Sequence, residues 1–295
     1  MKTPNKILKL GLPKGSLQES TFKIFRKAGF NLSVGERSYF PSLNDLEIEP
    51  VLLRAQEMSR YVEDQVLDCG ITGNDWVLEN NSKVIKVSEL TYAKQSLSPV
   101  RWVLAVPESS KIKNIKGLGG KLIATELVNV TKSFFKKNKV KVRVEFSWGA
   151  TEAKVVSGLV DAIVELTETG RSLKANKLKE IATICTSTTQ FIANKKAYSD
   201  SWKRRKMESI ILLLKGAIAA EEKVGIKMNV AKKNIERVIS LLPALKRPTV
   251  SGIAEDGWFA VETIIDEKVV RDLIPKLKLV GAQGIIEYPL NKLIY

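Results

Sequence analysis

Short apolar runs alternate along the chain with segments whose apolar residues recur every three or four positions. The run at 7–12 predicts a strand, and the apolar spacing of 17–28 predicts a helix that ends at Gly29. Further strands are predicted at 68–72, 101–106, 121–125, 142–146 and 161–166, and further helices at 57–67, around 134–135 and over 153–160. Because strands that alternate with helices are typical of β-α-β units, parallel sheets are expected up to about residue 215.

After that point the pattern changes. The predicted elements are a strand at 225–230, a helix at 231–242, strands at 249–253 and 258–265 around a turn at 255–257, a helix at 266–279 kinked at Pro275, and a strand at 284–288. This β-α-β-β-α-β order is typical of a ferredoxin-like module of about 75 residues. No internal repeat or low-complexity linker is visible, so only the change of pattern marks the boundary.

The length and the apolar runs bound the class of protein. A chain of 295 residues suggests two or three domains. No run approaches the ~18 apolar residues of a membrane span, and the apolar run after the basic start is too short for a signal-peptide core. Cys69 and Cys185 lie in or beside predicted strands and are interpreted as buried, reduced residues, which predicts a cytoplasmic location.

The charge balance leaves two interpretations open. A formal net charge of +16 is expected either for a protein with an anionic partner or for one whose lysines are simply solvated on every face. The basic residues are spread along the chain, with small clusters at 136–137 and 203–206. Histidine is absent, which excludes imidazole bases, including Ser-His-Asp and Cys-His catalysis, and argues against a catalytic zinc site.

Three strand-to-helix turns contain the candidate chemistry: "GLPKGSL" at 11–17, "DCGITGND" at 68–75 and "DAIVELTETGRSL" at 161–173. Such turns lie outside the carboxyl ends of strands, where open α/β sheets bind ligands. The third turn offers small or hydroxylated residues that can approach an anion closely, namely Thr167, Thr169, Gly170 and Ser172. A helix beginning within 173–178 would add its free amides, which predicts a phosphate cradle.

The acids of this turn suggest a sugar beside the phosphate. A carboxylate can accept hydrogen bonds from two vicinal hydroxyls, so Glu165 or Glu168 could hold the 2′- and 3′-hydroxyls of a ribose-5-phosphate. The structural alternative is a capped turn, in which Thr167 or Thr169 is the N-cap, Gly170 is the turn residue and Glu168 is solvated. The pattern by itself leaves both open.

Together these stretches resemble the ATP phosphoribosyltransferase family, which begins histidine biosynthesis. The similar stretches are "DAIVELTETGRSLKANKLK", "GLPKGSL", "LRAQEMSRYVEDQVLDCGITGND" at 52–75 and "RWVLAVP" at 101–107. Two later stretches, "LLPALKRPTVSGI" and "KLKLVGAQGIIEYPLNKLI", resemble the regulatory domain of that family. The resemblance covers essentially the whole chain and indicates the long form of the family.

The resemblance implies a fold and a reaction. The expected fold is α/β: a catalytic part of two lobes like those of periplasmic binding proteins, 1–100 with 184–212 and 101–183, and a ferredoxin-like (ACT-like) regulatory domain at 213–295. The expected reaction is attack by N1 of ATP on C1 of phosphoribosyl pyrophosphate, which gives N1-(5-phospho-β-D-ribosyl)-ATP and pyrophosphate. Mg²⁺ would be held mainly by substrate, with no protein metal ligand assigned. L-histidine would inhibit a hexamer that exchanges with dimers, and neither nucleic acid nor membrane is expected as a partner.

The resemblance also assigns residues. The 5-phosphate loop would be Thr167, Glu168, Thr169, Gly170, Arg171 and Ser172. Asp161 and Glu165 match acidic positions, the second of which is often aspartate in the family. The catalytic cations would be Lys14, Arg54 and Arg101, and the ATP cleft would include Lys14, Gly15, Gly70, Thr72, Gly73 and Asp75. Inhibitor contacts are expected at Asn229, Thr249, Ser251, Ala282 and Gly284, although strand or turn structure explains each equally well.

Two other classes of function stay open at this point. The lobes expected here also occur in proteins that bind small molecules without catalysis, although a phosphate loop argues against an amino-acid ligand. A nucleic-acid-binding regulator would account for the positive charge, but no helix-turn-helix or aromatic-basic surface pattern supports it.

Overall fold

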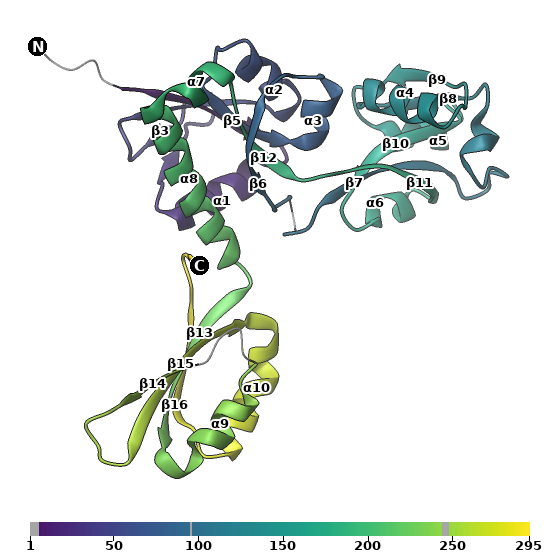
Figure 1. The fold of residues 1–295 in the computed structure, drawn as a ribbon. Coiled ribbons are helices and arrows are strands. Elements are labelled where there is room, and N and C mark those ends of the chain that lie inside the picture. Colours follow the sequence, from purple (N-terminus) through teal and green to yellow (C-terminus); the bar gives the residue numbers. More distant parts are fainter. Residues whose placement is uncertain (1–5, 95, 244–247) are drawn as a thin grey trace, which may run out of the picture. The chain divides into compact units, whose positions relative to one another are not determined.

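The computed structural model describes residues 6–94, 96–243 and 248–295. The chain forms two compact units that divide between Ile211 and Leu212, one residue before the boundary expected at 212/213 (Figure 1). Part of the stretch "LLPALKRPTVSGI", residues 244–247, lies outside the described residues, as do residues 1–5 of the basic start. No described helix has the length and apolar content needed to cross a membrane.

The first lobe of unit 1 is a five-stranded sheet in the order β4-β1-β5-β12-β6. Its strands are β1 (Leu8–Lys14), β4 (Ile48–Arg54), β5 (Cys69–Gly73), β6 (Ile85–Leu90) and β12 (Thr189–Ala193). The helices are α1 (Gln18–Ala28), α2 (Ala55–Glu63), α3 (Asn74–Glu79), α7 (Lys195–Ser199) and α8 (Ser201–Ala219), and β2 (Leu32–Ser33) pairs with β3 (Ser42–Leu43). The helix predicted at 17–28 is confirmed, with Gly29 in the left-handed region at its C-cap.

The second lobe is a five-stranded sheet in the order β11-β7-β10-β8-β9. Its strands are β7 (Val100–Pro107), β8 (Leu122–Thr125), β9 (Arg143–Phe146), β10 (Ala162–Thr167) and β11 (Leu178–Ser187). Its helical segments are η1 (Ile115–Leu118), α4 (Val128–Lys137), α5 (Thr151–Val156) and α6 (Arg171–Ala175).

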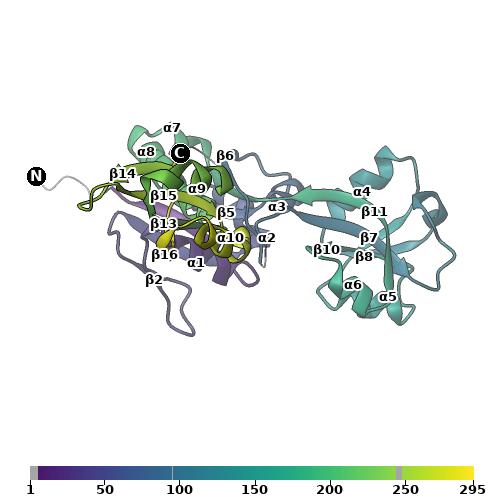
Figure 2. The same ribbon diagram turned by 90° about the horizontal axis from the view of Figure 1, so that it is seen from below.

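The two lobes repeat one topology that the sequence does not reveal. In each sheet, three parallel strands are followed by an antiparallel strand that arrives from the other lobe: β12 in the first lobe and β7 in the second. The chain therefore passes between the lobes twice, from β6 to β7 and from β11 to β12 (Figure 2). Because β11 continues to Ser187, the second passage is at Thr188, later than the expected 183/184.

Close packing of α2 on its sheet explains one glycine that we expected in the cleft. Met58 of α2 is fully buried, and a Cβ placed on Gly70 would lie 2.7 Å from its Sδ. A side chain at position 70 would force the Met58 side chain to move, so glycine allows the close packing of α2. Gly70 does not line the pocket described below, and its assignment to the ATP cleft has no support from this packing.

Unit 2 has the β-α-β-β-α-β order that its sequence pattern predicts. Its elements are β13 (Lys223–Ala231), η2 (Lys232–Asn234), α9 (Ile235–Leu241), β14 (Thr249–Gly252), β15 (Trp258–Asp266), α10 (Glu267–Leu279) and β16 (Gln283–Pro289). The sheet is antiparallel in the order β14-β15-β13-β16, the strand order of a ferredoxin-like module. The predicted helix 231–242 is shorter than expected, since a 3₁₀ turn precedes α9, while Pro275 lies within α10.

Candidate functional site

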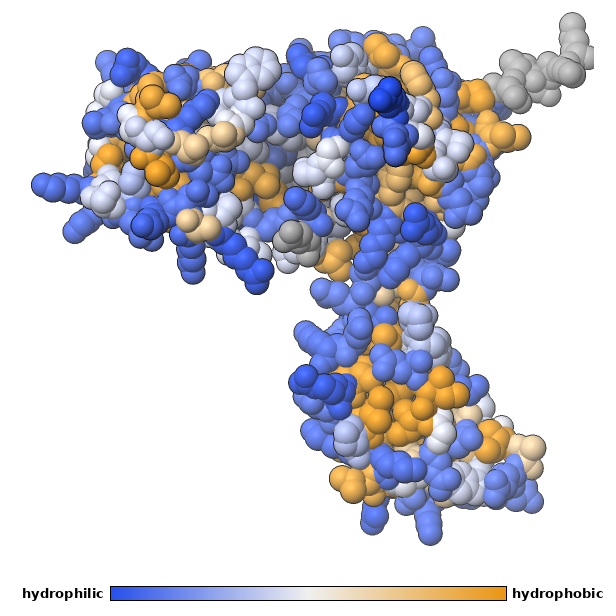
Figure 3. Space-filling model, turned by 180° about the vertical axis from the view of Figure 1, so that it is seen from behind, coloured by the Kyte–Doolittle hydropathy of each residue, from blue (hydrophilic) through white to orange (hydrophobic). Residues whose placement is uncertain are grey.

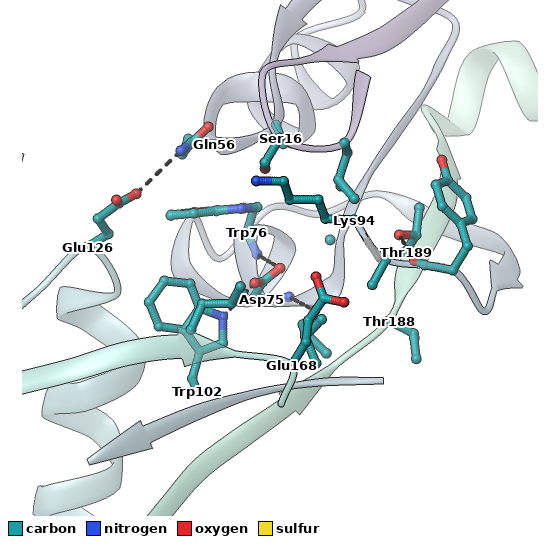
Figure 4. Close-up of a pocket in the computed structure, with 18 of the residues that line it drawn as sticks. Ser16, Gln56, Asp75, Trp76, Lys94, Trp102, Glu126, Glu168, Thr188 and Thr189 are labelled. Carbon is teal, nitrogen blue, oxygen red and sulfur yellow. Dashed lines mark hydrogen bonds between the residues drawn. The ribbon is translucent and has the colours of Figure 1, made fainter. Parts of the chain in front are cut away.

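A pocket of about 230 Å³ lies inside unit 1, with walls from both lobes (Figure 4). The first lobe and the segment after β6 contribute Lys14, Ser16, Leu17, Arg54, Ala55, Gln56, Gly73, Asp75, Trp76, Tyr92, Ala93 and Lys94. The second lobe and the passage to β12 contribute Val100, Trp102, Glu126, Glu165, Leu166, Glu168, Ser187, Thr188 and Thr189. Strand ends and the turns that follow them supply most of these residues, as expected for an α/β ligand site.

The β1–α1 turn and the start of α2 place cations on one wall. Lys14 ends β1, and its Nζ lies 3.7 Å from the centre of the Tyr39 ring. Arg54 ends the neighbouring parallel strand β4, in register with Lys14. Gly15 has φ +104, and a Cβ there would lie 3.2 Å from Nη1 of Arg54, so glycine leaves room for the guanidinium.

Carboxylates line the opposite wall. Glu165 is on β10, Glu126 follows β8, and Glu168 lies in the turn after β10, where its Oε2 accepts a hydrogen bond of 3.1 Å from Ser96 Oγ. Burial, together with the charges of Glu152 and Glu126, raises the pKa of Glu165 from 4.5 to about 7. The pocket thus has cations on one side and acids on the other, which suits a ligand with an anionic end and a hydroxylated end.

The turn after β10 combines the two interpretations that its sequence left open. The Thr167 hydroxyl accepts a hydrogen bond of 2.8 Å from the Gly170 N–H, so this threonine does stabilise the turn. Thr169, Arg171 and Ser172 are exposed, and a Cβ on Gly170 (φ +74) would meet nothing within 4 Å. An anion therefore has free access to the loop.

The helix expected after this loop is not the one observed. α6 spans only Arg171–Ala175, and β11 already begins at Leu178. A helix therefore does follow the loop, but it begins at Arg171, before the stretch 173–178 considered above, and it is short because Leu178 joins the sheet beside Pro107. A cradle at this place would depend on loop amides and hydroxyls, since five residues form little helix dipole.

Asp75 lies at the centre of the contacts between the lobes. Its carboxylate is 2% exposed and accepts hydrogen bonds from Trp102 Nε1 at 2.6 Å and from the Trp76 N–H at 3.0 Å (Figure 4). The Asp75 N–H donates to Ser187 Oγ at 3.0 Å. Burial raises the pKa of Asp75, and the hydrogen bond from Trp102 partly opposes this effect. Asp75 thus lines the pocket, but one carboxylate oxygen is bonded to Trp102 of the second lobe and the other to the Trp76 N–H of its own helix.

Two further contacts of the first lobe hold the lobes together. Glu79 of α3 accepts hydrogen bonds of 2.9 Å from the N–H groups of Asn129 and Val130 in the first turn of α4. Gln56 Nε2 donates to Glu126 across the pocket at 3.3 Å (Figure 4). The helix α3 is therefore hydrogen-bonded to both α4 and β7 of the second lobe. These bonds hold the two walls of the pocket at a fixed distance.

Gly15, Thr167 and the residues 169–172 do not line the pocket, although the last two groups adjoin its residues Glu165, Leu166 and Glu168.

Three further predicted side chains have other partners away from the pocket. Asp161 precedes β10, at the opposite end from Thr167, where it pairs with Lys121 at 2.9 Å and accepts from the Leu122 N–H. Arg101 pairs with Glu180 at 2.6 Å, on the face of β7 opposite Trp102. Thr72 is buried and donates to the Ala55 carbonyl at 2.7 Å, which holds the start of α2. Each of these side chains has a structural contact in place of the expected ligand contact.

Several pocket residues were missed by the sequence analysis. They are Ser16, Gln56, Trp76, Tyr92, Lys94, Trp102, Glu126, Ser187, Thr188 and Thr189. Ser16 and Trp102 belong to stretches that were singled out, so their turn and strand were available as signals. Thr188 and Thr189 lie where the chain returns between the lobes, which no local pattern marks.

The predicted inhibitor residues fall partly in one row of unit 2. Ser251 is opposite Ala260, Ala260 is opposite Asn229, and Asn229 is opposite Gln283, so the row runs across all four strands. Thr249 is opposite Glu262, outside this row, and Ala282 is fully buried just before β16. Gly284 has φ +56, and a Cβ there would lie 3.7 Å from Nδ2 of Asn229.

The basic cluster at 203–206 has mostly structural partners. Lys203 pairs with Asp68 at 2.6 Å, and Lys206 pairs with Asp45 at 2.8 Å and with Glu47 at 2.7 Å. These pairs join α8 to the first lobe and favour the interpretation of this cluster as an ordinary protein surface. Cys69 is buried and Cys185 is half-buried, and both are free thiols.

Comparison with known proteins gives a consistent family. The family model described as ATP phosphoribosyltransferase matches residues 54–216, and the model described as HisG, C-terminal domain, matches residues 220–292. The ATP phosphoribosyltransferase of Thermodesulfovibrio yellowstonii is 59% identical over 290 residues, 98% of this chain and 99% of the relative. That of Chlorobium luteolum is 57% identical over 294 residues, the full length of both chains.

One solved structure is similar at the level of fold and sequence. It is the ATP phosphoribosyl transferase (HisG:HisZ) complex from Thermotoga maritima, with a TM-score of 0.60 and 28% identity. The alignment covers 70% of this chain and 98% of the Thermotoga chain.

Proposed function

The chain belongs to the ATP phosphoribosyltransferase family, and from that premise we propose that it transfers the 5-phosphoribosyl group of phosphoribosyl pyrophosphate to N1 of ATP. The products are N1-(5-phospho-β-D-ribosyl)-ATP and pyrophosphate, in the first step of histidine biosynthesis. The observation that supports this assignment most directly is the division of the pocket into a basic wall, with Lys14 and Arg54, and an acidic wall beside an open hydroxylated loop.

The two walls suggest how phosphoribosyl pyrophosphate would lie. The 5-phosphate would be held by the loop amides and by the hydroxyls of Thr169 and Ser172, which are exposed there. Glu165, on the strand that leads into the loop, would accept hydrogen bonds from the ribose hydroxyls. The pyrophosphate would face Lys14 and Arg54, because these cations line the other side of the pocket.

The chemistry needs no protein base, which suits a chain without histidine. N1 of adenine is already a neutral nucleophile, so its lone pair forms the bond to C1 while the bond from C1 to the pyrophosphate oxygen breaks. The pyrophosphate takes the bonding electrons, and positive charge develops on the ribose ring. Orientation of the two substrates and neutralisation of the leaving group by Lys14 and Arg54 would supply most of the rate.

Mg²⁺ would supply charge neutralisation on the pyrophosphate. Within the described ranges, no three His, Cys, Asp or Glu side chains gather as a metal site. That the ion is carried by substrate oxygens and water stays a prediction, and no protein ligand is assigned.

Unit 2 is proposed as the regulatory domain, ACT-like and inhibited by L-histidine. Its strand order and the match of residues 220–292 to the family's C-terminal domain support this part. We place the inhibitor near the row that contains Ser251 and Asn229. Inhibition would require unequal affinity of histidine for two states of the assembly.

A homo-oligomer, a hexamer in exchange with dimers, is proposed as the working assembly. Unit 2 exposes the apolar side chains of Val250, Leu279 and Ile286, which supports subunit contacts. Figure 3 shows apolar residues gathered on one face of this unit. The solved Thermotoga relative is named as a complex with HisZ. No such partner is proposed here, because this chain has its own C-terminal domain. The cytoplasmic location stays a prediction.

The deciding experiment measures pyrophosphate release from ATP, phosphoribosyl pyrophosphate and Mg²⁺, with and without L-histidine. Release that needs both substrates and is suppressed by histidine supports both the enzyme and its regulation. Release that histidine does not suppress keeps the enzyme and overturns the regulatory part. No release under any condition favours a binding protein without catalysis, which equilibrium binding of phosphorylated sugars would then test.

A further inference from the structure

Glu126 is an acid of the pocket to which the placement of phosphoribosyl pyrophosphate gives no role. It directly follows Thr125, the last residue of β8, and Thr125 is opposite Val164 on the parallel neighbour β10. Glu165 is the residue after Val164, so Glu126 and Glu165 occupy matching positions on strands about 4.8 Å apart, and both line the pocket. A second acceptor thus lies beside the acid that is proposed to hold the ribose hydroxyls.

An amide NH₂ group of the other lobe faces Glu126. Gln56 Nε2 donates to Glu126 Oε2, and at 3.3 Å this hydrogen bond is long (Figure 4). The Gln56 backbone is held on the first turn of α2, because its carbonyl accepts a hydrogen bond of 2.8 Å from Asn80 Nδ2. Both side chains are half-buried. An amino group of a ligand can therefore replace the glutamine at the carboxylate with little loss.

Two tryptophans give the same pocket an aromatic surface. The Trp76 and Trp102 rings line it with their centres 5.9 Å apart and their planes at 87°. Asp75 holds both residues, since it accepts from Trp102 Nε1 at 2.6 Å and from the Trp76 N–H at 3.0 Å. Fixed aromatic surfaces favour a planar aromatic ligand. The pocket therefore suits a base as well as a sugar phosphate.

The proposed reaction restricts how an adenine can be recognised. Its N1 needs a free lone pair to attack C1, so a hydrogen-bond donor on N1 would block the reaction. The 6-amino group and N7 remain, and a glutamine amide matches this pair by accepting from the amino group and donating to N7. The second amino hydrogen lies on the side of N1, where a carboxylate is a suitable acceptor. The pair of Gln56 and Glu126 has this composition.

We propose that Glu126 is a catalytic residue that accepts a hydrogen bond from the 6-amino group of ATP, while Gln56 pairs with the same amino group and N7. This inference rests on the proposed function. As the bond from N1 to C1 forms, pyrophosphate leaves with the electrons of the C1–O bond, and no proton moves. The adenine then carries positive charge shared between N1 and the 6-amino nitrogen, which the Glu126 carboxylate stabilises. Purines with a 6-oxo group are rejected, because they offer no amino hydrogen to Glu126.

The test compares ATP with purine riboside 5′-triphosphate, which has N1 but lacks the 6-amino group, in the full-length protein. Glu126→Ala should lower kcat/KM for ATP by about tenfold or more, as expected for a lost hydrogen bond to a charged group. The same variant should change kcat/KM for the analogue by less than about twofold. Equal losses with the two nucleotides would overturn the proposal, because Glu126 would then only join the lobes.

Glu126→Gln separates the charge from the hydrogen bond. The amide oxygen still accepts from an amino group but carries no negative charge. Because the positive charge on adenine exists only as the new bond forms, kcat with ATP should fall by about tenfold or more, while KM for ATP changes by less than about threefold. A kcat equal to that of the wild type would contradict the catalytic role.

Glu79→Ala is the matched control. Glu79 also joins the lobes, through the N–H groups of Asn129 and Val130. Its loss should lower kcat/KM for ATP and for the analogue by the same factor. If Glu79→Ala also removed the preference for ATP, the effect would come from the spacing of the lobes and the proposal would fail.

Equilibrium binding separates this proposal from the proposed function. Titration calorimetry without phosphoribosyl pyrophosphate should show that the wild type binds ATP more tightly than the analogue and that Glu126→Ala binds the two alike. A wild type that keeps this preference but releases no pyrophosphate would refute the proposed function alone. Pyrophosphate release by the wild type, with a preference for ATP that survives Glu126→Ala in binding and in kcat/KM, would refute the role of Glu126 alone.

Discussion

The turns after β5 and β10 occupy the same place in the two sheets, yet one is closed and the other is open. Both follow the third parallel strand of their lobe and contain a glycine and an acid. In the first, Asp75 is buried, and a Cβ on Gly73 would collide with its carboxylate. In the second, a Cβ on Gly170 would meet nothing within 4 Å.

The strands that connect the two lobes bury the turn after β5 and leave the turn after β10 exposed. Trp102 on β7 and Ser187 at the end of β11 both bond to Asp75 and cover the first turn. In the loop 168–172 the hydroxyls of Thr169 and Ser172 are exposed, and among the described strands none from the first lobe covers them in the same way. One turn thus fixes the lobes and the other is free to receive a ligand. Similar turn sequences can therefore serve a structural and a binding role in one fold.

The largest expected effect comes from Asp75→Ala. It leaves the buried Trp102 indole N–H and the Trp76 N–H without their acceptor, which should lower the free energy of unfolding of unit 1 by about 3 kcal/mol. Chemical denaturation followed by tryptophan fluorescence measures this change. Asp75→Asn keeps an acceptor and should cost clearly less. Equal losses for the two variants would contradict the hydrogen-bond explanation.

Gly170→Val tests the open turn. The valine side chain would occupy the open space over the loop, where the 5-phosphate is proposed to bind. KM for phosphoribosyl pyrophosphate should therefore rise on the order of tenfold or more, which corresponds to about 1.4 kcal/mol of binding free energy. KM for ATP should change little. Gly158→Val is the control, since Gly158 (φ +72) also has nothing within 4 Å and lies outside the loop 167–172. Because Gly158 also has a positive φ, this variant should lower Tm by a similar amount, but KM for phosphoribosyl pyrophosphate should not change. An unchanged KM in Gly170→Val would break the loop assignment.

Glu79→Ala tests the hydrogen bonds between α3 and the first turn of α4 in the second lobe. Two N–H groups of α4 would lose their acceptor, so unit 1 should lose about 1–2 kcal/mol of stability and kcat should fall more than either KM changes. Denaturation and steady-state kinetics measure the two effects. Glu57→Ala removes a long surface pair with Arg60, 3.8 Å, and should change neither. A kcat equal to wild type in Glu79→Ala would show that the contact does not position the walls.

Removal of unit 2 tests whether this unit contains the proposed histidine-binding site and the subunit contacts. A chain ending after Ala219 keeps α8 whole and should lose histidine inhibition and assemble into smaller species, with pyrophosphate release retained. Inhibition assays and sedimentation measure the two properties. Histidine inhibition in the shortened chain would place the inhibitor in unit 1.

The smallest effect is expected for Arg101→Gln. Arg101 forms an exposed pair with Glu180 outside the pocket, so kcat/KM should change by less than about twofold. Arg54→Gln removes a cation that lines the pocket and should cost considerably more. A large kinetic loss in Arg101→Gln would restore the role that the family resemblance gave it.

Most elements could be predicted from the sequence, because their signals are local. The apolar spacing of 17–28 and the cap at Gly29 define α1, and the alternation of 225–230 defines the centre of β13. The exceptions have tertiary causes. Leu178 joins β11 and not a helix because it pairs with Pro107, seventy-one positions away in the chain. α8 continues past the expected boundary, where Leu214 and Ala217 are buried and the Gly216 carbonyl accepts a hydrogen bond from the Leu293 N–H.

For the site, the chemistry of each turn was already evident from the residues: a lysine at the end of β1, hydroxyls and a glycine after β10, and no histidine in the chain. Residue types and their spacing fix such properties because they act within a few positions of the chain. Only the tertiary structure decided which of these groups share a pocket. Arg101 pairs with Glu180, Asp161 pairs with Lys121, and Trp102 donates a hydrogen bond to Asp75. These contacts could not be predicted locally, since side-chain direction and burial follow from strand pairing between residues far apart in sequence.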